Sequence, residues 1–319
     1  IATSLLFSCF ECWMVSEHLG RNDFSGGLLS YMFGLMFMSM YCTAIVSGVV
    51  GELLVESFSF HRMAKDSLVY VGGALAPFDL AIVCLVIGAV LILTLWHENY
   101  GTNAASEDED DAQGALAGFK AALRILASDR RVWLVGVMVA CFEGSMFAFI
   151  FNWTPALSSE AVPPPYGLIF SLFMMACMSG ASVSTLLDAT VAPGLRLAAI
   201  FVVGAMALAI AAVVSPSAQL PMCFATFVLF EFCVGVYFPS VGMLKSGIVP
   251  EHVRGTIYNI YRVPLNAVVL ALLLTDMSIV RVYVLCALLL GVAFACAALI
   301  MVAPPQSLPT MEGKLAKQV

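Results

Sequence analysis

Residues 195–214 read LRLAAIFVVGAMALAIAAVV, and Arg196 is the single charged side chain in this stretch. A helix of about 20 mainly apolar residues is long enough to cross the hydrocarbon core of a bilayer. Similar runs occur at about 28–51, 69–96, 132–152, 166–187, 219–241, 255–275 and 281–302, and a shorter one covers residues 1–16. The sequence therefore predicts an all-α, polytopic membrane protein.

Composition supports a membrane protein and excludes several other classes. Of the 319 residues, 61% are hydrophobic and 11% are charged, whereas soluble domains carry about 25% charged residues. The 14 Lys and Arg residues never cluster with aromatic residues, so we expect no nucleic-acid partner. Phosphate-binding loops, nucleophile elbows and paired zinc-binding histidines do not occur in the sequence. We therefore expect no enzymatic activity, no metal and no cofactor.

The long polar segment after residue 97 divides the chain. We expect residues 1–97 to form the remainder of an N-terminal helix bundle, with the end of helix 4 and helices 5 and 6. Residues 98–131 are expected to form a cytoplasmic linker with an acidic run and an amphipathic helix, residues 132–303 a six-helix bundle, and residues 304–319 a cytoplasmic tail. Six helices after a long linker are typical of one half of a 6 + 6 carrier, so we expect about nine of twelve helices, with about three and a half missing before Ile1.

Lys and Arg residues in the loops indicate the orientation of the helices, because cytoplasmic loops carry an excess of them. With the linker inside, ten of these cations fall in inner segments, Lys245 among them, and three fall in outer loops. This count favours a cytoplasmic linker and a cytoplasmic C-terminus. We expect an integral membrane protein of the plasma membrane.

Three ionisable residues, Glu143, Glu231 and Arg262, fall near the middle of predicted spans. A charge at that depth costs at least about 2.5–3.5 kcal/mol and therefore points to a function. Arg262 shares one helical face with Asn259 and Asn266, at i, i+3 and i+7. A guanidinium between two amides suits an oxyanion, so these three residues are predicted to bind substrate. The alternative is an Arg262 that only pairs with one glutamate and locks the bundle.

Glu143 and Glu231 have two interpretations. Either one of them pairs with Arg262, or an unpaired, buried carboxyl group carries a proton during transport. Both remain candidates for a charge-coupling or ion-pair role. Further candidates, for the lining of a central cavity, are Asn152, Tyr237 and Asp79.

Short motifs follow one another along the chain in an order typical of one family. They are SLLFS (4–8) before ECW (11–13) and EH (17–18), SDRR (128–131), FE (142–143) before WTP (153–155), GLIFS (167–171), Glu231 before YFPS (237–240), and RVPL (262–265). In these motifs the chain resembles the molybdate-anion transporter family of the major facilitator superfamily, over nearly its whole length. The resemblance implies a 12-helix carrier that imports molybdate, a tetrahedral dianion. Glu143, Glu231 and Arg262 all lie within these motifs.

Moving a dianion through a membrane requires compensating positive charge. Arg262 supplies one charge, Asn259 and Asn266 supply neutral donors, and a second cation or a co-transported proton has to come from elsewhere. Rocking of the two helix blocks would then give alternating access. The expected partners are a small oxyanion and the lipid bilayer, with no obligate protein partner. The alternatives are a carrier of another small anion or organic solute, and a membrane receptor or scaffold that transports nothing.

Overall fold

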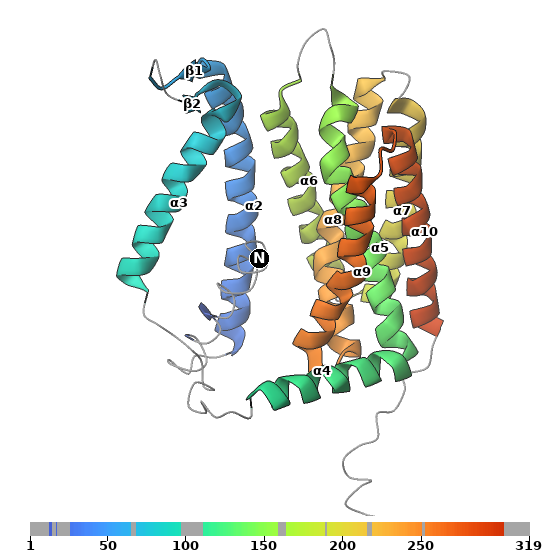
Figure 1. Cartoon of the computed structure of the whole chain (residues 1–319). Helices are drawn as coiled ribbons and strands as arrows, with labels where there is room; N and C mark the ends of the chain where they lie inside the picture. Colours follow the sequence, from blue (N-terminus) through green and yellow to red (C-terminus); the bar gives the residue numbers. More distant parts are fainter. Residues whose placement is uncertain are drawn as a thin grey trace, which may run out of the picture. The chain divides into compact units, whose positions relative to one another are not determined.

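The computed structural model describes residues 13–14, 17, 26–64, 68–96, 111–158, 164–188, 190–215, 219–250 and 253–302 (Figure 1). Its elements are α2 (Gly26–Ser57), β1 (His61–Arg62), β2 (Tyr70–Val71), η2 (Gly73–Leu75), α3 (Ala76–Leu95), α4 (Asp111–Ser128), α5 (Arg130–Leu157), α6 (Tyr166–Leu187), α7 (Pro193–Val214), α8 (Leu220–Ile248), α9 (Arg254–Leu274) and α10 (Ile279–Val302). Within the described ranges, eight helices are long and apolar enough to cross a membrane. This confirms the predicted polytopic helical fold. The span expected at 1–16 lies outside the described residues, apart from residues 13–14.

Prolines and one aspartate mark the beginnings of several helices. Pro77, Pro193 and Pro221 lie in the first turns of α3, α7 and α8, where an N–H group would have no intrahelical acceptor. Asp129 accepts a 2.8 Å hydrogen bond from the backbone N–H of Arg131 at the start of α5, as an N-cap residue does.

Three helices extend further than their apolar runs predict. α2 was expected to end near residue 51 and continues to Ser57. α5 was expected to end near residue 152 and continues to Leu157, and α8 was expected to end near residue 241 and continues to Ile248. At 29 residues, α8 is about 44 Å long, which is more than the thickness of the hydrocarbon core. Hydropathy alone therefore does not mark its end.

The chain divides into two compact units. Unit 1 comprises Ile1–Leu116 and Ser158–Met178, and unit 2 comprises Ala117–Leu157 and Ser179–Val319. Unit 1 therefore holds α2, α3 and the first half of α6, whereas unit 2 holds the second half of α6 together with α5 and α7 to α10. The bundle expected at 132–303 differs from this grouping, because contacts join residues 158–178 to the helices that precede the linker.

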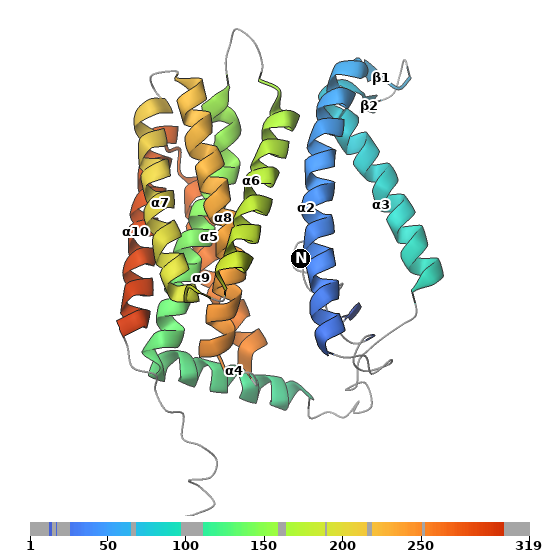
Figure 2. The same ribbon diagram turned by 180° about the vertical axis from the view of Figure 1, so that it is seen from behind.

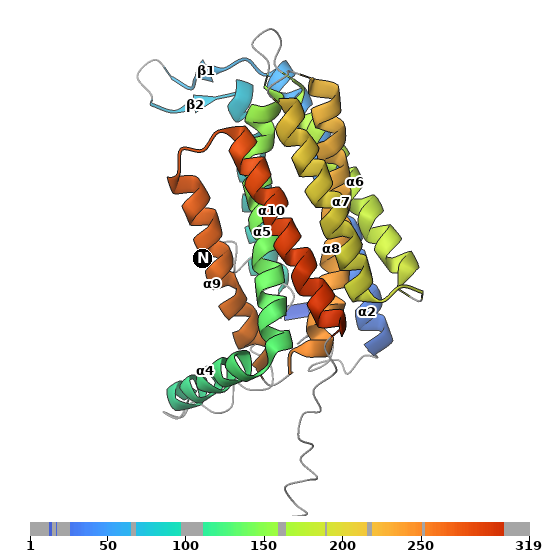
Figure 3. The same ribbon diagram turned by 90° about the vertical axis from the view of Figure 1, so that its right-hand side faces the viewer.

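The core of unit 2 is built from tightly packed aromatic rings. α7 packs against α8 and α10 (Figure 2), and α5 packs against α10 and α9 (Figure 3). The rings of Phe142, Phe149, Phe201, Phe227 and Phe230 are completely buried between these helices. The interlocked rings fix the positions of α5 and α8 relative to each other.

In unit 1, α2 and the first half of α6 approach each other through glycine. A Cβ atom on Gly48 would lie 2.5 Å from the carbonyl oxygen of Gly167, and a Cβ atom on Gly167 would collide with the carbonyl oxygen of Gly48. Glu52 accepts a 2.7 Å hydrogen bond from the backbone N–H of Gly167, in the first turn of α6. A carboxylate is stabilised there by the unpaired N–H groups and by the helix dipole.

A short hairpin precedes α3. β1 and β2 pair in antiparallel register, with Arg62 opposite Tyr70. Gly72 has a φ of 80°, which favours glycine, and its N–H donates a 3.1 Å hydrogen bond to the carboxylate of Asp79. Asp79 therefore ties the first turn of α3 to the end of the hairpin.

Candidate functional site

Three charged residues on different helices of unit 2 lie close enough for their charges to interact. Glu143 lies on α5, Lys245 on α8 and Arg262 on α9. The carboxylate of Glu143 attracts both cations, and the two cations repel each other. Glu143 and Lys245 are half-buried, whereas Arg262 is exposed. The cluster thus combines two positive charges with one negative charge, and one of its cations is accessible.

The carboxylate of Glu143 is held by a buried tyrosine. The hydroxyl of Tyr237 donates a hydrogen bond of 3.0 Å to Oε1 of Glu143. The ring of Tyr237 is completely buried and stacks on Phe142, with 3.9 Å between the ring centroids. Because the ring cannot move without disturbing the aromatic core, its hydroxyl is a fixed donor at the end of an apolar side chain.

The orientation of α9 is set by its contact with α5. Ile257, Tyr261 and Leu265 are buried and follow i, i+4 and i+8 spacing, so they share one face. Tyr261 fits against Gly136 of α5, where a Cβ atom would lie 2.5 Å from its ring, and its hydroxyl donates a 2.6 Å hydrogen bond to the carbonyl oxygen of Val132.

This contact leaves the three predicted substrate-binding residues on the open side of α9. Asn259, Arg262 and Asn266 are all exposed, in keeping with the shared face that their spacing predicts. The packing of Tyr261 and Leu265 against α5 turns them away from the core. Their side chains can therefore meet a ligand without any change in the helix contact.

The amino group of Lys245 lies against an aromatic ring of α9. Its Nζ atom is 4.8 Å from the ring centroid of Tyr258, within the range of a cation–π interaction. Tyr258 lies one turn before Arg262, which is about 6 Å along the helix axis. The two cations therefore follow one another along the direction of α9.

An ion-pair lock on Arg262 is not formed in the described part of the chain. There, the one hydrogen bond recorded for the carboxylate of Glu143 comes from Tyr237 and not from Arg262. Glu231 is buried within α8, with 7% of its surface exposed, six residues before Tyr237. The structure thus brings Arg262 and Glu143 within electrostatic range of each other.

Two of the predicted cavity residues have local roles. Asn152 donates a 2.8 Å hydrogen bond from its side chain to the carbonyl oxygen of Ala148, one turn earlier in α5. Asp79 accepts the N–H of Gly72 in unit 1, as described above. The third, Tyr237, contacts Glu143 directly. Tyr237 therefore belongs with the charge cluster, whereas Asn152 and Asp79 are satisfied by nearby backbone.

Lys245 is the residue of the cluster that the sequence does not predict. With α8 expected to end near residue 241, Lys245 falls in an inner loop, but the helix continues to Ile248. The signal was available in the spacing of Tyr237, Val241 and Lys245, at i, i+4 and i+8 on one helix face.

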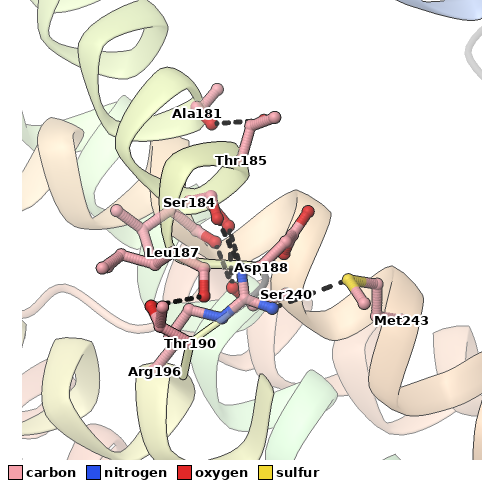
Figure 4. A network of polar contacts seen from close by, with 10 residues as sticks. Ala181, Ser184, Thr185, Leu187, Asp188, Thr190, Arg196, Ser240 and Met243 are labelled. Atoms are coloured by element: carbon pink, nitrogen blue, oxygen red, sulfur yellow. Dashed lines mark hydrogen bonds and ion pairs between the residues drawn. The ribbon is translucent and has the colours of Figure 1, made fainter. Parts of the chain in front are cut away.

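A second charged cluster joins Arg196 to neighbouring protein groups (Figure 4). Arg196 of α7 is 3% exposed and pairs with Asp188. Its guanidinium also donates hydrogen bonds to the backbone oxygen and the hydroxyl of Ser184, at 2.7 and 2.9 Å. The Ser184 hydroxyl lies 3.1 Å from that of Ser240, so the network joins α6, α7 and α8. We interpret it as a structural ion pair.

The chain is similar to known membrane transporters. A family model described as sugar transporters with 12 transmembrane segments matches residues 1–236. The chain is 31% identical, over 270 residues, to proteins named "Molybdate-anion transporter" from Xenopus laevis and Xenopus tropicalis, with 83% of this chain and 55% of each relative covered. A protein of the same name from Danio rerio is 29% identical over 286 residues, with 83% of this chain and 56% of that protein covered. The chain thus spans about half the length of the curated relatives it matches.

Proposed function

Because the chain belongs to the molybdate-anion transporter family of the major facilitator superfamily, we propose that it forms part of a carrier that imports molybdate by alternating access. The observation that carries this proposal is the contact between α8 and α9, in which Nζ of Lys245 lies 4.8 Å from the ring centroid of Tyr258, one helical turn before Arg262. Two like charges are held near one another at a cost, which an anion between them would remove.

The two cations match the charge of the proposed substrate. Molybdate carries two negative charges, and a dianion in a region of low dielectric constant needs two compensating positive charges. At 4 Å and an effective dielectric constant of about 20, each such pair contributes about 4 kcal/mol before desolvation is subtracted. Lys245 supplies the second cation that the sequence leaves unassigned.

The two side chains would bind the anion in different ways. The guanidinium of Arg262 offers a planar fork that donates two hydrogen bonds to neighbouring oxygens of an oxyanion. Lys245 acts as a point charge on a flexible stem. Asn259 and Asn266, exposed on the same side of α9 as Arg262, would donate amide hydrogen bonds to the remaining oxygens.

The arrangement of the cations also suits release on the inner side. Lys245 lies in the last turn of α8, and Arg262 lies eight residues after the start of α9, about 12 Å along its axis. The end of α8 and the start of α9 are joined by the short segment at 249–253, which we propose to be cytoplasmic because of the excess of Lys and Arg in the inner segments. An anion that leaves Arg262 toward that side would meet Lys245 next.

The same observations bear on the membrane in which the protein lies and on its orientation there. The helices and the transporter family support an integral membrane protein that acts as a carrier and not as an enzyme. We propose a plasma-membrane location with the linker at 98–131 and the C-terminal tail at 304–319 in the cytoplasm. The six helices at 132–303 are proposed to form the C-terminal bundle, and residues 1–97 to belong to the N-terminal one.

Uptake of radiolabelled molybdate by cells that express the complete gene product tests the proposal. Arg262→Ala and Lys245→Ala should each lower uptake at least about tenfold, as expected for the loss of about 1.4 kcal/mol or more of binding free energy. Lys120→Ala, which removes an exposed cation of α4, is the matched control and should keep wild-type uptake. Surface labelling shows that each variant reaches the membrane. Wild-type uptake by both Arg262→Ala and Lys245→Ala would refute the proposed site.

The competing anion-carrier hypothesis is tested in the same assay. Excess sulfate or a dicarboxylate is added together with the labelled molybdate. If molybdate is the substrate, unlabelled molybdate competes at the lowest concentration. Stronger competition by a dicarboxylate would assign the cations to an organic anion instead.

A further inference from the structure

We propose that Glu143 is a proton-binding site, and that the carrier moves one proton together with each dianion. The inference rests on the proposed function, because it assumes that the anion binds at Arg262 and Lys245. It goes further by naming the coupling ion and the residue that holds it.

Charge balance in the cluster is the first argument. With Glu143 ionised, the cluster of Glu143, Lys245 and Arg262 has a net charge of +1, and a bound dianion would bring it to −1. With Glu143 protonated, the cluster has a charge of +2, and the bound complex is neutral. A neutral complex is the more favourable one at low dielectric constant. Proton binding and anion binding therefore favour each other at this site.

The hydrogen bond from Tyr237 is the second argument. Its hydroxyl donates to Oε1 of Glu143, and an oxygen that accepts this bond can do so in both protonation states. In the neutral form Oε1 is the carbonyl oxygen and Oε2 carries the proton. The carboxyl group therefore keeps its position when it gains or loses a proton. Because Glu143 is half-buried and not fully enclosed, protons from water can reach it.

Among the titratable groups of the cluster, Glu143 is the one that can accept a proton from water. The titratable side chains that face it are Tyr237 and Lys245 from α8 and Arg262 from α9. α10 packs against the opposite side of α5, where Cys286 lies against Ser145. Glu231 of α8 is buried six residues before Tyr237. Among the groups facing Glu143, the tyrosine donates a hydrogen bond and the two cations attract its charge.

Protons and charges balance over one transport cycle. On the side where the site opens first, Glu143 takes a proton from water as the dianion binds to Arg262 and Lys245. On the other side the dianion leaves, and Glu143 returns its proton to water because its charge is again attracted by the two cations. Each cycle thus carries one proton and one dianion in the same direction.

The experiment uses the complete gene product in liposomes loaded with a pH-sensitive dye. Addition of molybdate should move protons into wild-type liposomes, and a pH gradient of one unit should raise accumulation of molybdate up to about tenfold. Glu143→Gln should still exchange labelled for unlabelled molybdate but lose its response to the gradient. Glu56→Gln, at an exposed position of α2, is the matched control and should keep that response. Replacement of sodium by choline should leave uptake unchanged.

The outcomes separate this inference from the proposed function. If wild-type protein transports molybdate without moving protons, or if Glu143→Gln keeps its response to the gradient, Glu143 is not the proton site although the anion site stands. If Arg262→Ala exchanges molybdate as wild type does, the anion site itself is wrong. The dye measurement on wild-type protein can refute proton coupling even where a variant fails to fold, and the loss of the response in Glu143→Gln assigns the site.

Discussion

Tyr237 on α8 donates a 3.0 Å hydrogen bond to Glu143 on α5, across 94 positions of the sequence. This bond joins the aromatic core of unit 2 to its charge cluster, because the tyrosine ring is completely buried and stacked on Phe142. The core and the proposed site are thus connected through one side chain.

Removal of this hydroxyl should destabilise the protein. In Tyr237→Phe the carboxylate of Glu143 loses a buried donor, which costs about 1–3 kcal/mol and lowers the melting midpoint in detergent by several degrees. Glu143→Gln should have a smaller effect, since its amide oxygen can still accept the bond. Equal melting midpoints for wild type and Tyr237→Phe would show that the bond contributes nothing.

Two substitutions of Tyr258 separate the contribution of its aromatic face, which lies beside Lys245, from that of its hydroxyl. Tyr258→Leu removes the cation–π contact, which contributes about 0.5–1 kcal/mol at exposed sites, and should raise the apparent KM for the anion about twofold to fivefold. Tyr258→Phe keeps the ring face over Lys245 and should keep the wild-type KM. Initial uptake rates measured over a range of molybdate concentrations give both values. If the two variants have the same KM, the ring does not position Lys245.

The glycine contact in unit 1 should be sensitive to a single methyl group. Gly167→Ala places a Cβ atom against the carbonyl oxygen of Gly48 and the backbone nitrogen of Glu52, so α2 and α6 have to move apart. Overpacking of this kind costs about 1–3 kcal/mol. Gly88→Ala on α3, where a Cβ atom meets nothing within 4 Å, is the control. A melting midpoint lowered as much by Gly88→Ala as by Gly167→Ala would contradict the close contact.

Substitutions of Arg196 and Asp188 should destabilise the protein to different degrees. Arg196 is almost completely buried, whereas the Asp188 side chain is 37% exposed. Arg196→Ala leaves Ser184 and Asp188 without their charged donor and should cost about 3–5 kcal/mol, seen as a loss of folded protein in the membrane. Asp188→Asn should cost less, because solvent screens the change. Arg281→Ala, at an exposed position of α10, should be neutral, and an equally severe loss in that variant would contradict this assignment.

The sequence predicts the number and type of helices well, because eight apolar runs are long enough to span a membrane. Helix ends were less predictable. α8 continues to Ile248, past the limit of its apolar run, and this hides Lys245 from an analysis of loops. The shared face of Asn259, Arg262 and Asn266 follows from helical spacing alone.

Contacts between helices could not be predicted from local patterns. Glu143 and Glu231 look equivalent in the sequence, since both fall in the middle of a span. Only the structure shows that Glu143 of α5 accepts a hydrogen bond from Tyr237 of α8, and that Glu231 is the more deeply buried of the two carboxyl groups. The roles of Arg262, Asn259 and Asn266 as substrate ligands remain predictions.

Direct binding of labelled molybdate to the purified complete gene product tests the central claim, that Arg262 and Lys245 together hold the anion. Wild-type protein should bind molybdate saturably, and the double variant Arg262→Ala/Lys245→Ala should bind at least about 100-fold more weakly, as expected for the loss of about 2.8 kcal/mol or more. Lys120→Ala should bind as wild type does. A folded double variant that binds molybdate with wild-type affinity would contradict the account.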